Sequence, residues 1–544
     1  MKLHVILRFA IIALFVICFV KRAGGPALAD EIDFILPMHK WVADGPQRIG
    51  VFHAPFYPWV ESYLASFFSV KTGVLRLIGL VTTLLASGFL VAAALIVHPL
   101  LAPWRLTILL ALALLAPYTL GSALILDHDP TVLLAATALY FFLMALHDRP
   151  SRDHQGRLVL TFGLALGLCL MGKESTALVY PAGLVLLFWP TFGFARALLL
   201  AALSGVLGCM FFLAVTSLWC SYYAIPLSTV FEMDLLGLTL MGGHPQPWNV
   251  LSFGASVWVK VVPMLWLGLP LSLLFLKRIP LIFRAGGAAR AIALNVLLVL
   301  FTYTFLLRQT TYNFPKYMSP ILLWIPWLVL VPDRESTGHS NLTSENFRSW
   351  AFVILLWFIL VPLDPMWVLH DRTPHSLWLA LAVFTVPTAV WVAVRYLNLT
   401  SWSNGSPRFS TMSLLFSVGL ALIYCRTALI SNASITYWYG DTSIAEAVTQ
   451  VQDWRAKNPT GKIFVPSKDI AYSTREFGTI YISKDSLGAD ATTLCADKKP
   501  LLVVTRMRED TSLSRAAEYD VLRKCLGPIV QGVDIAFASA YSQN

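Results

Sequence analysis

Residues 106–147 read LTILLALALLAPYTLGSALILDHDPTVLLAATALYFFLMALH, a pattern typical of a helical membrane protein. Two apolar runs, 106–126 and 131–147, stand on either side of the sequence Asp127-His128-Asp129-Pro130. A transmembrane helix needs about 20 mostly apolar residues, so each run predicts a membrane span. The residues between them predict a polar turn at the membrane surface, where ionisable groups are unfavourable unless they serve a purpose.

Apolar runs of this kind recur along the chain, of which 57% is hydrophobic and only 13% is charged. A soluble domain carries about 25% charged residues. The composition therefore excludes a soluble enzyme, and it also excludes a disordered, collagen-like or disulfide-framed chain. We predict a polytopic α-helical membrane protein with about thirteen spans, at residues 3–20, 74–98, 106–126, 131–147, 158–172, 177–191, 195–219, 253–276, 291–307, 318–331, 350–370, 377–395 and 412–430.

The formal charge of +10 is distributed unevenly along the chain. Residues 431–544 hold 13 basic and 13 acidic side chains, so residues 1–430 hold the remaining 27 and 17. We therefore predict a basic membrane domain over residues 1–430, followed by a neutral soluble domain over 431–544. The neutral soluble part has no basic run, which argues against a nucleic acid partner.

Lysine and arginine in short loops mark the cytoplasmic side of a membrane protein. If the N-terminus is cytoplasmic, the cytoplasmic loops hold most of the basic residues: Arg105, Arg149, Arg152, Arg157, Arg196, Lys277, Arg278, Arg284, Arg290, Arg334, Arg348, Arg395 and Arg408. An odd number of spans then puts the C-terminal domain outside the cytoplasm. Cys495 and Cys525 would meet an oxidising compartment there, and their spacing leaves open whether they are bonded.

The first span also has a rival interpretation as a cleaved signal peptide. Ala27-Leu28-Ala29 precedes Asp30 and resembles a signal-peptidase site. Lys21 and Arg22 interrupt the path from the apolar run to this site, so we favour a retained first helix.

The C-terminal domain is predicted to be a small α/β domain. Residues 442–458 have helical periodicity, with Val451 and Trp454 among the apolar residues on one face. Residues 462–466, 479–483, 501–505 and 535–539 are typical of short strands.

Ionisable and aromatic residues from four external segments are candidates for a functional site. The first external loop, 21–73, begins with Asp30 and Glu31 and then carries His53 and Tyr57 in an aromatic, proline-rich stretch. The other three segments supply the remaining candidates: Asp127, His128, Asp129, Lys173, Glu174, Arg308, Lys316 and Tyr317.

External cations are not expected from the positive-inside rule, so Lys173, Arg308 and Lys316 favour an anionic ligand. Each group also has a simpler interpretation, as a solvated helix end, a structural ion pair or a packed loop histidine. The Asp-His-Asp sequence contains possible metal ligands, but no further ligands are evident. We predict no obligatory metal or other cofactor, with a divalent cation left possible.

The order of these segments resembles that of the polytopic GT-C-type glycosyltransferases, which include protein O-mannosyltransferases and the lipid A aminoarabinose transferases. The acidic pair Asp30-Glu31 and the stretch from His53 to Pro58 look like the first external loop of this family. Three later segments are also similar to family motifs: Leu126–Pro130, Gly163–Glu174 and Lys316–Pro320. His53-Ala54-Pro55 departs from the family's usual His-Pro-Pro or Lys-Pro, and its recognisable protein-acceptor modules are absent.

The resemblance implies a bacterial inner-membrane enzyme that moves a sugar from a polyprenyl-phosphate donor to a lipid, glycan or protein acceptor and inverts the anomeric centre. Asp30 matches the family's catalytic carboxylate, and Glu31 is the second candidate for the base. Lys173, Arg308 and Lys316 would stabilise the leaving phosphate. The other candidates would bind the sugar, the phosphate or the acceptor: His53, Tyr57, Asp127, His128, Asp129, Glu174 and Tyr317.

Two other classes of protein were weighed against the enzyme. A transporter or lipid flippase would place ionisable residues near the middle of spans and repeat in two related halves, and neither feature is evident. A scaffold or receptor would leave the clustered external acids without a purpose.

Overall fold

The computed structural model describes residues 2–24, 31, 63, 66–68, 71–224, 226–230, 275, 278–302, 318–331, 418, 421, 422, 425, 429, 442–465, 468–481, 501–506, 529–531 and 535–540. The chain forms two compact units. The first comprises Met1–Ala23 and Pro37–Trp438, and the second comprises Gly24–Leu36 and Tyr439–Asn544.

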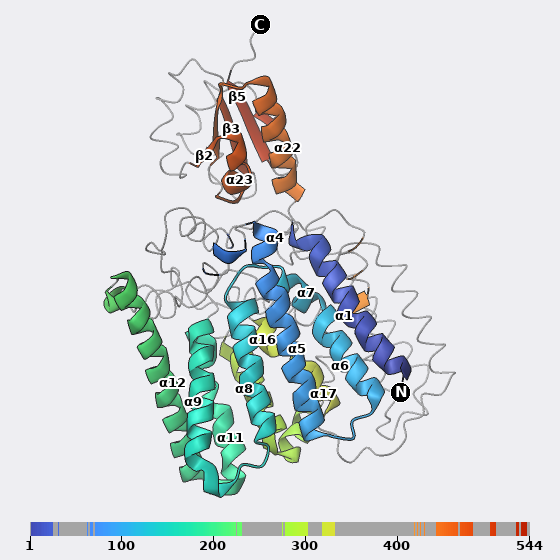
Figure 1. The fold of residues 1–544 in the computed structure, drawn as a ribbon, viewed down its shortest axis with the longest axis vertical. Coiled ribbons are helices and arrows are strands. Elements are labelled where there is room, and N and C mark those ends of the chain that lie inside the picture. Colours follow the sequence, from blue (N-terminus) through green and yellow to red (C-terminus); the bar gives the residue numbers. More distant parts are fainter. Residues whose placement is uncertain are drawn as a thin grey trace, which may run out of the picture. The chain divides into compact units, whose positions relative to one another are not determined.

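The first unit is a bundle of helices (Figure 1). Its described helices are α1 (Lys2–Ala23), α4 (Thr72–Leu75), α5 (Leu77–Val97), α6 (Pro103–Leu115), α7 (Pro117–Ala123), a π-helix (Asp129–Leu133), α8 (Leu134–Leu146), a 3₁₀ turn (Arg152–His154), α9 (Gln155–Gly172), α10 (Glu174–Ala177), α11 (Pro181–Phe192), α12 (Phe194–Tyr223), α13 (Leu227–Val230), α15 (Gly287–Phe301), α16 (Ser319–Leu322) and α17 (Ile325–Leu330).

Five helical segments in the described part of the chain are long and apolar enough to cross a membrane: Leu3–Ala23, Thr72–Val97, Arg152–Gly172, Glu174–Phe192 and Phe194–Tyr222. Each overlaps a span predicted from the sequence. Four shorter apolar helices cover four further predicted spans: Pro103–Leu115, Pro130–Leu146, Gly287–Phe301 and Ser319–Leu330. The chain is thus a helical membrane protein, and the predicted spans 253–276, 350–370, 377–395 and 412–430 lie almost wholly outside the described residues.

The bundle is held together by side-chain packing between helices that are distant in sequence. α12 packs along both α9 and α11, and α8 packs against α5 and α9. In the core, Tyr140 stacks on Tyr180 with 5.4 Å between ring centroids, and Trp324 meets Phe141 edge-on at 5.3 Å. The Tyr180 hydroxyl lies 2.9 Å from Thr137 Oγ1, so this buried polar group is satisfied within the bundle.

Arginine side chains join helix ends at one end of the bundle. Arg152 Nε donates to the Thr191 carbonyl at 2.9 Å, which ties the start of α9 to the end of α11. Arg105 Nη1 donates to the Leu330 carbonyl at 3.3 Å, and Arg278 donates to the Val329 carbonyl, both at the end of α17. Last-turn carbonyls have no partner within their own helix, so these cations satisfy them and complement the helix dipole. We call this the arginine end of the bundle; the positive-inside rule predicts that it faces the cytoplasm.

Helix α15 begins at the same end with a capping contact that comes from another part of the chain. Asp148 Oδ1, just after α8, accepts a hydrogen bond from the Ala288 N–H at 2.7 Å. A Cβ on Gly287 would lie 2.2 Å from the same oxygen, and Gly287 has φ +57°. Glycine is therefore required at position 287 for both space and backbone conformation.

Asp148→Ala is expected to lower the unfolding free energy by about 0.5–2 kcal/mol, the usual loss when an N-cap side chain is removed. Thermal unfolding of the purified protein in detergent measures the effect. Asp153→Ala is the matched control, because Asp153 is exposed in the neighbouring 3₁₀ turn. Equal midpoints for the two variants would show that the Asp148 cap does not stabilise the bundle.

The second unit contains a five-stranded sheet of order β2-β1-β3-β5-β4. Its elements are α22 (Thr442–Lys457), β1 (Lys462–Val465), α23 (Lys468–Ser473), a 3₁₀ turn (Arg475–Phe477), β2 (Thr479–Tyr481), β3 (Leu501–Arg506), β4 (Ile529–Gln531) and β5 (Ile535–Ala540). β1 pairs in parallel with β2 and β3, whereas β5 pairs antiparallel with β3 and β4.

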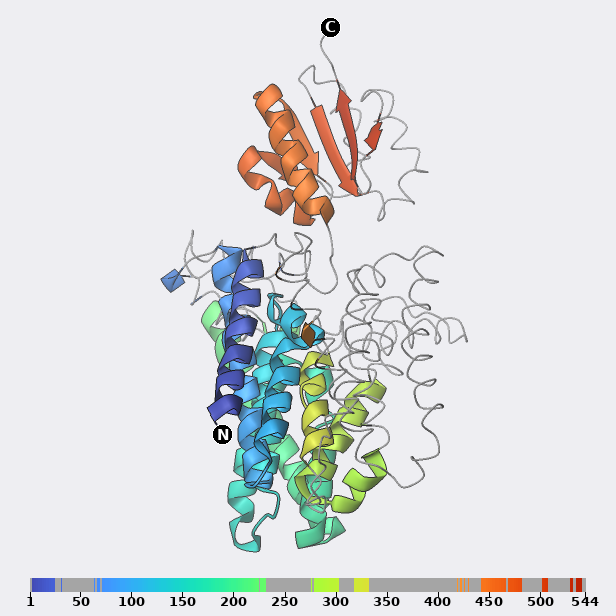
Figure 2. The same cartoon turned by 90° about the vertical axis from the view of Figure 1, so that its right-hand side faces the viewer.

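Both helices of this unit cover the same face of the sheet (Figure 2). Val451 from α22 and Ile470 from α23 pack with Ile463, Val465 and Leu502, all of them buried. Ile463 pairs with Leu502 across the parallel strands, so their side chains point to one face. The predicted helix and the four predicted strands are present, and β4 and α23 are additional elements.

Candidate functional site

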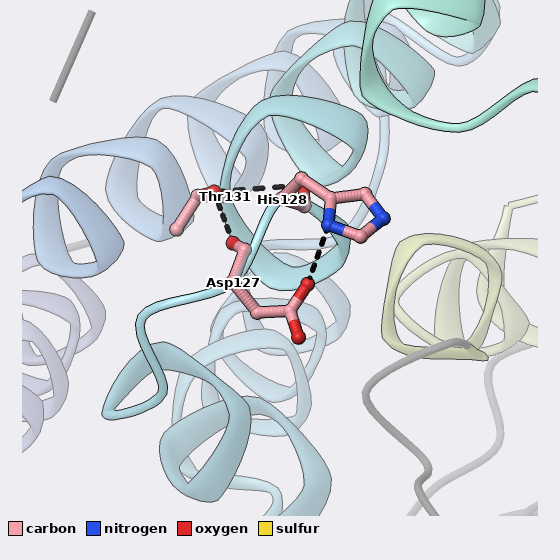
Figure 3. A network of polar contacts seen from close by, with 3 residues as sticks. All are labelled: Asp127, His128 and Thr131. Carbon is pink, nitrogen blue, oxygen red and sulfur yellow. Dashed lines mark hydrogen bonds and ion pairs between the residues drawn. The ribbon is translucent and has the colours of Figure 1, made fainter. Parts of the chain in front are cut away.

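The acidic turn between α7 and α8 is buried in the first unit. Asp127 and His128 are each only 2% exposed. The Asp127 carboxylate points toward the imidazole, with 2.7 Å between Oδ1 and His128 Nδ1 (Figure 3). A carboxylate beside an imidazole can share a proton, orient a hydroxyl or balance a cation.

Local chemistry explains why the chain turns at this point. Pro130 has no N–H and cannot continue a regular helical ladder. The Thr131 hydroxyl instead donates to the Asp127 carbonyl at 2.5 Å, and the Leu133 N–H reaches back five residues to the His128 carbonyl at 2.9 Å. The resulting π-helix leads directly into α8, and these two bonds satisfy the backbone carbonyls of Asp127 and His128. Single π-turns of this kind are frequent at functional sites.

A second polar turn follows α9, which ends at Gly172. Lys173 is extended, with φ −165° and ψ 118°, and α10 begins at Glu174. Lys173 is half-buried and Glu174 is 6% exposed. A break of one residue between two helices thus places a cation and a buried carboxylate next to each other at the end of the bundle opposite the arginine end.

The end of α9, next to Lys173, packs closely on the π-helix that follows Asp127 and His128, because Gly172 has no side chain. A Cβ at Gly172 would lie 2.8 Å from Leu133 Cα and 2.9 Å from Leu133 N, so the end of α9 touches the backbone of the π-helix. α16 also contacts this π-helix, and α16 begins three residues after Lys316. Among the described residues, the fold therefore brings two of the four predicted segments together at one end of the bundle.

Arg76 lies at this end as well, although it was not among the residues predicted for the site. The Arg76 side chain is 1% exposed, and its Nη1 donates to the Ala23 carbonyl at 2.9 Å. A buried guanidinium thus fixes the last residue of α1, from which the chain continues toward Asp30 seven residues later. Its location within the first turn of the predicted span 74–98 was the signal in the sequence that could have identified Arg76 as a functional candidate.

The remaining candidates divide into three groups. Asp30, His53, Tyr57, Arg308, Lys316 and Tyr317 lie outside the described residues, as do Cys495 and Cys525. Asp129 is described through its backbone, as the first residue of the π-helix. Glu31 is fully buried and belongs to the second unit.

Among the described residues, no group of three or more histidine, cysteine, aspartate or glutamate side chains is arranged to hold a metal ion. Asp127 and His128 supply two possible ligands, fewer than the metal-binding geometries that combine carboxylate and imidazole require. The expectation of no obligatory metal stays a prediction.

Comparison with models of known protein families and with characterised proteins gives no match. Comparison with solved structures gives similarity over nearly the whole chain. The chain is 17% identical to ArnT from Cupriavidus metallidurans in the apo state, covering 98% of this chain and 97% of that one, with a TM-score of 0.60. It is 16% identical to the same protein bound to undecaprenyl phosphate, covering 99% and 98%, again with a TM-score of 0.60. The similarity confirms the fold that the sequence motifs indicated.

Proposed function

We propose that this protein is an inverting glycosyltransferase that moves a sugar from a polyprenyl-phosphate donor to an acceptor of the cell envelope. The meeting of two ionisable turns at one end of the bundle carries the proposal. Asp127 and His128 on one turn and Lys173 and Glu174 on the other are joined through the contact of Gly172 with Leu133. The fold that holds them resembles that of ArnT, which has been solved with undecaprenyl phosphate bound.

The proposed chemistry needs a base for the acceptor hydroxyl and cations for the leaving group. Asp30 takes the proton as the acceptor oxygen attacks C1 of the sugar, with Glu31 as the second candidate. The bond from C1 to the lipid phosphate breaks, and positive charge stabilises the phosphate that leaves. Lys173 supplies part of that charge, with Arg308 and Lys316 as its proposed partners.

The buried carboxylates of the bundle have a different proposed role. Asp127 is held by His128 and Glu174 is buried next to Lys173, so both are fixed and suited to orienting sugar hydroxyls or the acceptor. His53, Tyr57, His128, Asp129 and Tyr317 complete the proposed substrate-binding set. A monophosphate leaving group does not demand the divalent ion that nucleotide diphosphates usually need, so no metal is assigned a role.

The proposal includes an arrangement in the membrane. Residues 1–430 form the membrane domain with about thirteen spans, and residues 431–544 form an extracytoplasmic α/β domain of an inner-membrane protein. The arginine end faces the cytoplasm and the two polar turns face outward. A lipid or glycan acceptor fits a site at that membrane surface.

Mass spectrometry of envelope glycolipids and glycans tests the function directly. A deletion strain is expected to lack one sugar modification that the parent carries, and the purified protein is expected to restore it in vitro when given the polyprenyl-phosphate sugar. Altered location of an otherwise unchanged glycolipid would instead indicate a flippase or transporter. Identical envelopes in both strains, together with no transfer in vitro, would overturn the proposal.

A further inference from the structure

A groove runs between α1 and α5 on the first unit, with α6 as its floor. α1 and α5 each pack against α6 and make little contact with each other, and α6 lies between them in the bundle (Figure 1). The groove has a volume of about 380 Å³, within the range of about 300–1,000 Å³ that ligand sites occupy. Its walls are mostly apolar, with side chains from all three helices: Val5, Phe9, Ile12, Leu84, Val91, Leu110 and Leu114.

Arg8 supplies a fixed positive charge to this groove. Its Nη2 donates to the Pro103 carbonyl at 2.9 Å, and its Nε lies 3.3 Å from Thr107 Oγ1. Both partners are uncharged groups of α6, and within the described part of the chain no carboxylate forms an ion pair with Arg8. A guanidinium has five N–H donors, so Arg8 is held in place with donors left for an anion.

Ser87 contributes a buried hydroxyl that has no hydrogen-bond partner among the described residues. It is 2% exposed and lines the groove. Two neighbouring hydroxyls bond back to the preceding turn: Thr82 Oγ1 in α5 donates to the Ile78 carbonyl at 2.8 Å, and Thr107 Oγ1 in α6 donates to the Pro103 carbonyl at 3.0 Å. Thr83 in α5 is also buried without a partner among the described residues, but only Ser87 lines the groove. A buried hydroxyl without such a bond is unfavourable, so Ser87 points to a ligand with an acceptor atom.

Gly88 makes room next to Ser87. A Cβ at this position would meet no atom within 4 Å. Its lining residues span Val5–Ile12 on α1, Leu84–Val91 on α5 and Leu110–Leu114 on α6. At a rise of about 1.5 Å per residue, the seven steps along α1 or α5 are about 10 Å of mostly apolar surface, with Arg8 and Ser87 contributed by different helices.

We propose that this groove binds one molecule of an anionic glycerophospholipid. The phosphate pairs with Arg8, an ester carbonyl accepts the Ser87 hydroxyl, and one acyl chain fills the apolar part between α1 and α5. Leu3, Ile6 and Phe9 on α1 are each more than 60% exposed, so this side of the bundle is suited to contact with lipid. Basic pockets between membrane helices on the cytoplasmic side are typical sites for anionic lipid headgroups. The groove lies toward the arginine end, away from the two polar turns, so it is distinct from the proposed donor site.

Native mass spectrometry of the full-length protein, with phosphatidylglycerol or phosphatidylcholine added to the detergent, tests the proposal. Wild-type protein is expected to bind phosphatidylglycerol in preference to phosphatidylcholine. Arg8→Gln is expected to weaken phosphatidylglycerol binding by about tenfold, because a hydrogen bond to a charged group is lost, while Arg8→Lys retains part of the affinity. Arg196→Gln is the matched control at the same end of the bundle, where Arg196 bonds to Gln155.

Gly88→Leu fills the groove without meeting a neighbouring atom at the Cβ, and is expected to abolish binding of both phospholipids while the unfolding midpoint stays at or above that of wild type. Ser87→Ala is expected to weaken binding a few-fold without lowering the midpoint. Unchanged binding in Arg8→Gln and Gly88→Leu would overturn the site. Displacement of phosphatidylglycerol by an equimolar polyprenyl phosphate, with the same dependence on Arg8, would overturn the proposed occupant.

Discussion

Asp30→Asn is expected to abolish sugar transfer by membranes that contain the protein, with a loss of at least about 10²–10⁴-fold, the usual contribution of a general base. Asparagine has nearly the shape of aspartate but cannot accept a proton from the acceptor hydroxyl. Asp30 is the first acidic residue after the first membrane span, α1. It follows Ala23, whose carbonyl accepts a hydrogen bond from Arg76, by seven residues. The measurement is transfer of a labelled sugar from the polyprenyl-phosphate donor, normalised to the amount of folded protein.

Two neighbouring variants make this experiment specific. Asp33→Asn removes the same charge three residues farther along the same loop, and it is expected to retain most of the activity. Glu31→Gln tests the second candidate, which the structure buries in the second unit. Full activity in Asp30→Asn would remove Asp30 as the base, and a selective loss in Glu31→Gln would assign the role to Glu31 instead.

The helices of the bundle were predictable because each depends on a local property of the chain. An apolar run of about 20 residues is sufficient to indicate a span, and α9 and α12 overlap the runs 158–172 and 195–219. In the second unit, short apolar runs with β-branched residues identified β1 and β3. β4 (Ile529–Gln531) was not predicted, because its position next to β5 depends on pairing across the sheet.

The geometry of the candidate site was less predictable because it depends on contacts between distant segments. The sequence identified Asp127 and Lys173 as unusual outside residues. It could not show that Gly172 touches Leu133, which is what joins their two turns. Nor could it show that Arg76 is buried against the end of α1, because a single arginine at the edge of a span is equally typical of a solvated helix end.

A second experiment with a large expected effect concerns the contact between α5 and α7. A Cβ at Gly79 would lie 2.0 Å from the Ala123 carbonyl oxygen and 3.0 Å from its carbon. Both atoms belong to the backbone and cannot move aside as a flexible side chain can. Small residues let membrane helices approach this closely, so Gly79→Ala is expected to force α5 and α7 apart and to lower the unfolding free energy by about 1–3 kcal/mol or more.

Gly88→Ala is the matched control, because the same substitution in the same helix meets no atom within 4 Å. Replacement of glycine by alanine in a helix interior favours folding by up to about 1 kcal/mol, so the two variants are expected to shift the thermal midpoint in detergent in opposite directions. Ala123 stands four residues before Asp127, and the displaced α7 is therefore also expected to disturb the acidic turn and reduce sugar transfer in the folded fraction of Gly79→Ala. An increase in the unfolding midpoint of both variants would show that α5 and α7 are not in contact at Gly79. An unchanged specific activity in Gly79→Ala would show that catalysis does not depend on the position of α7 and the acidic turn.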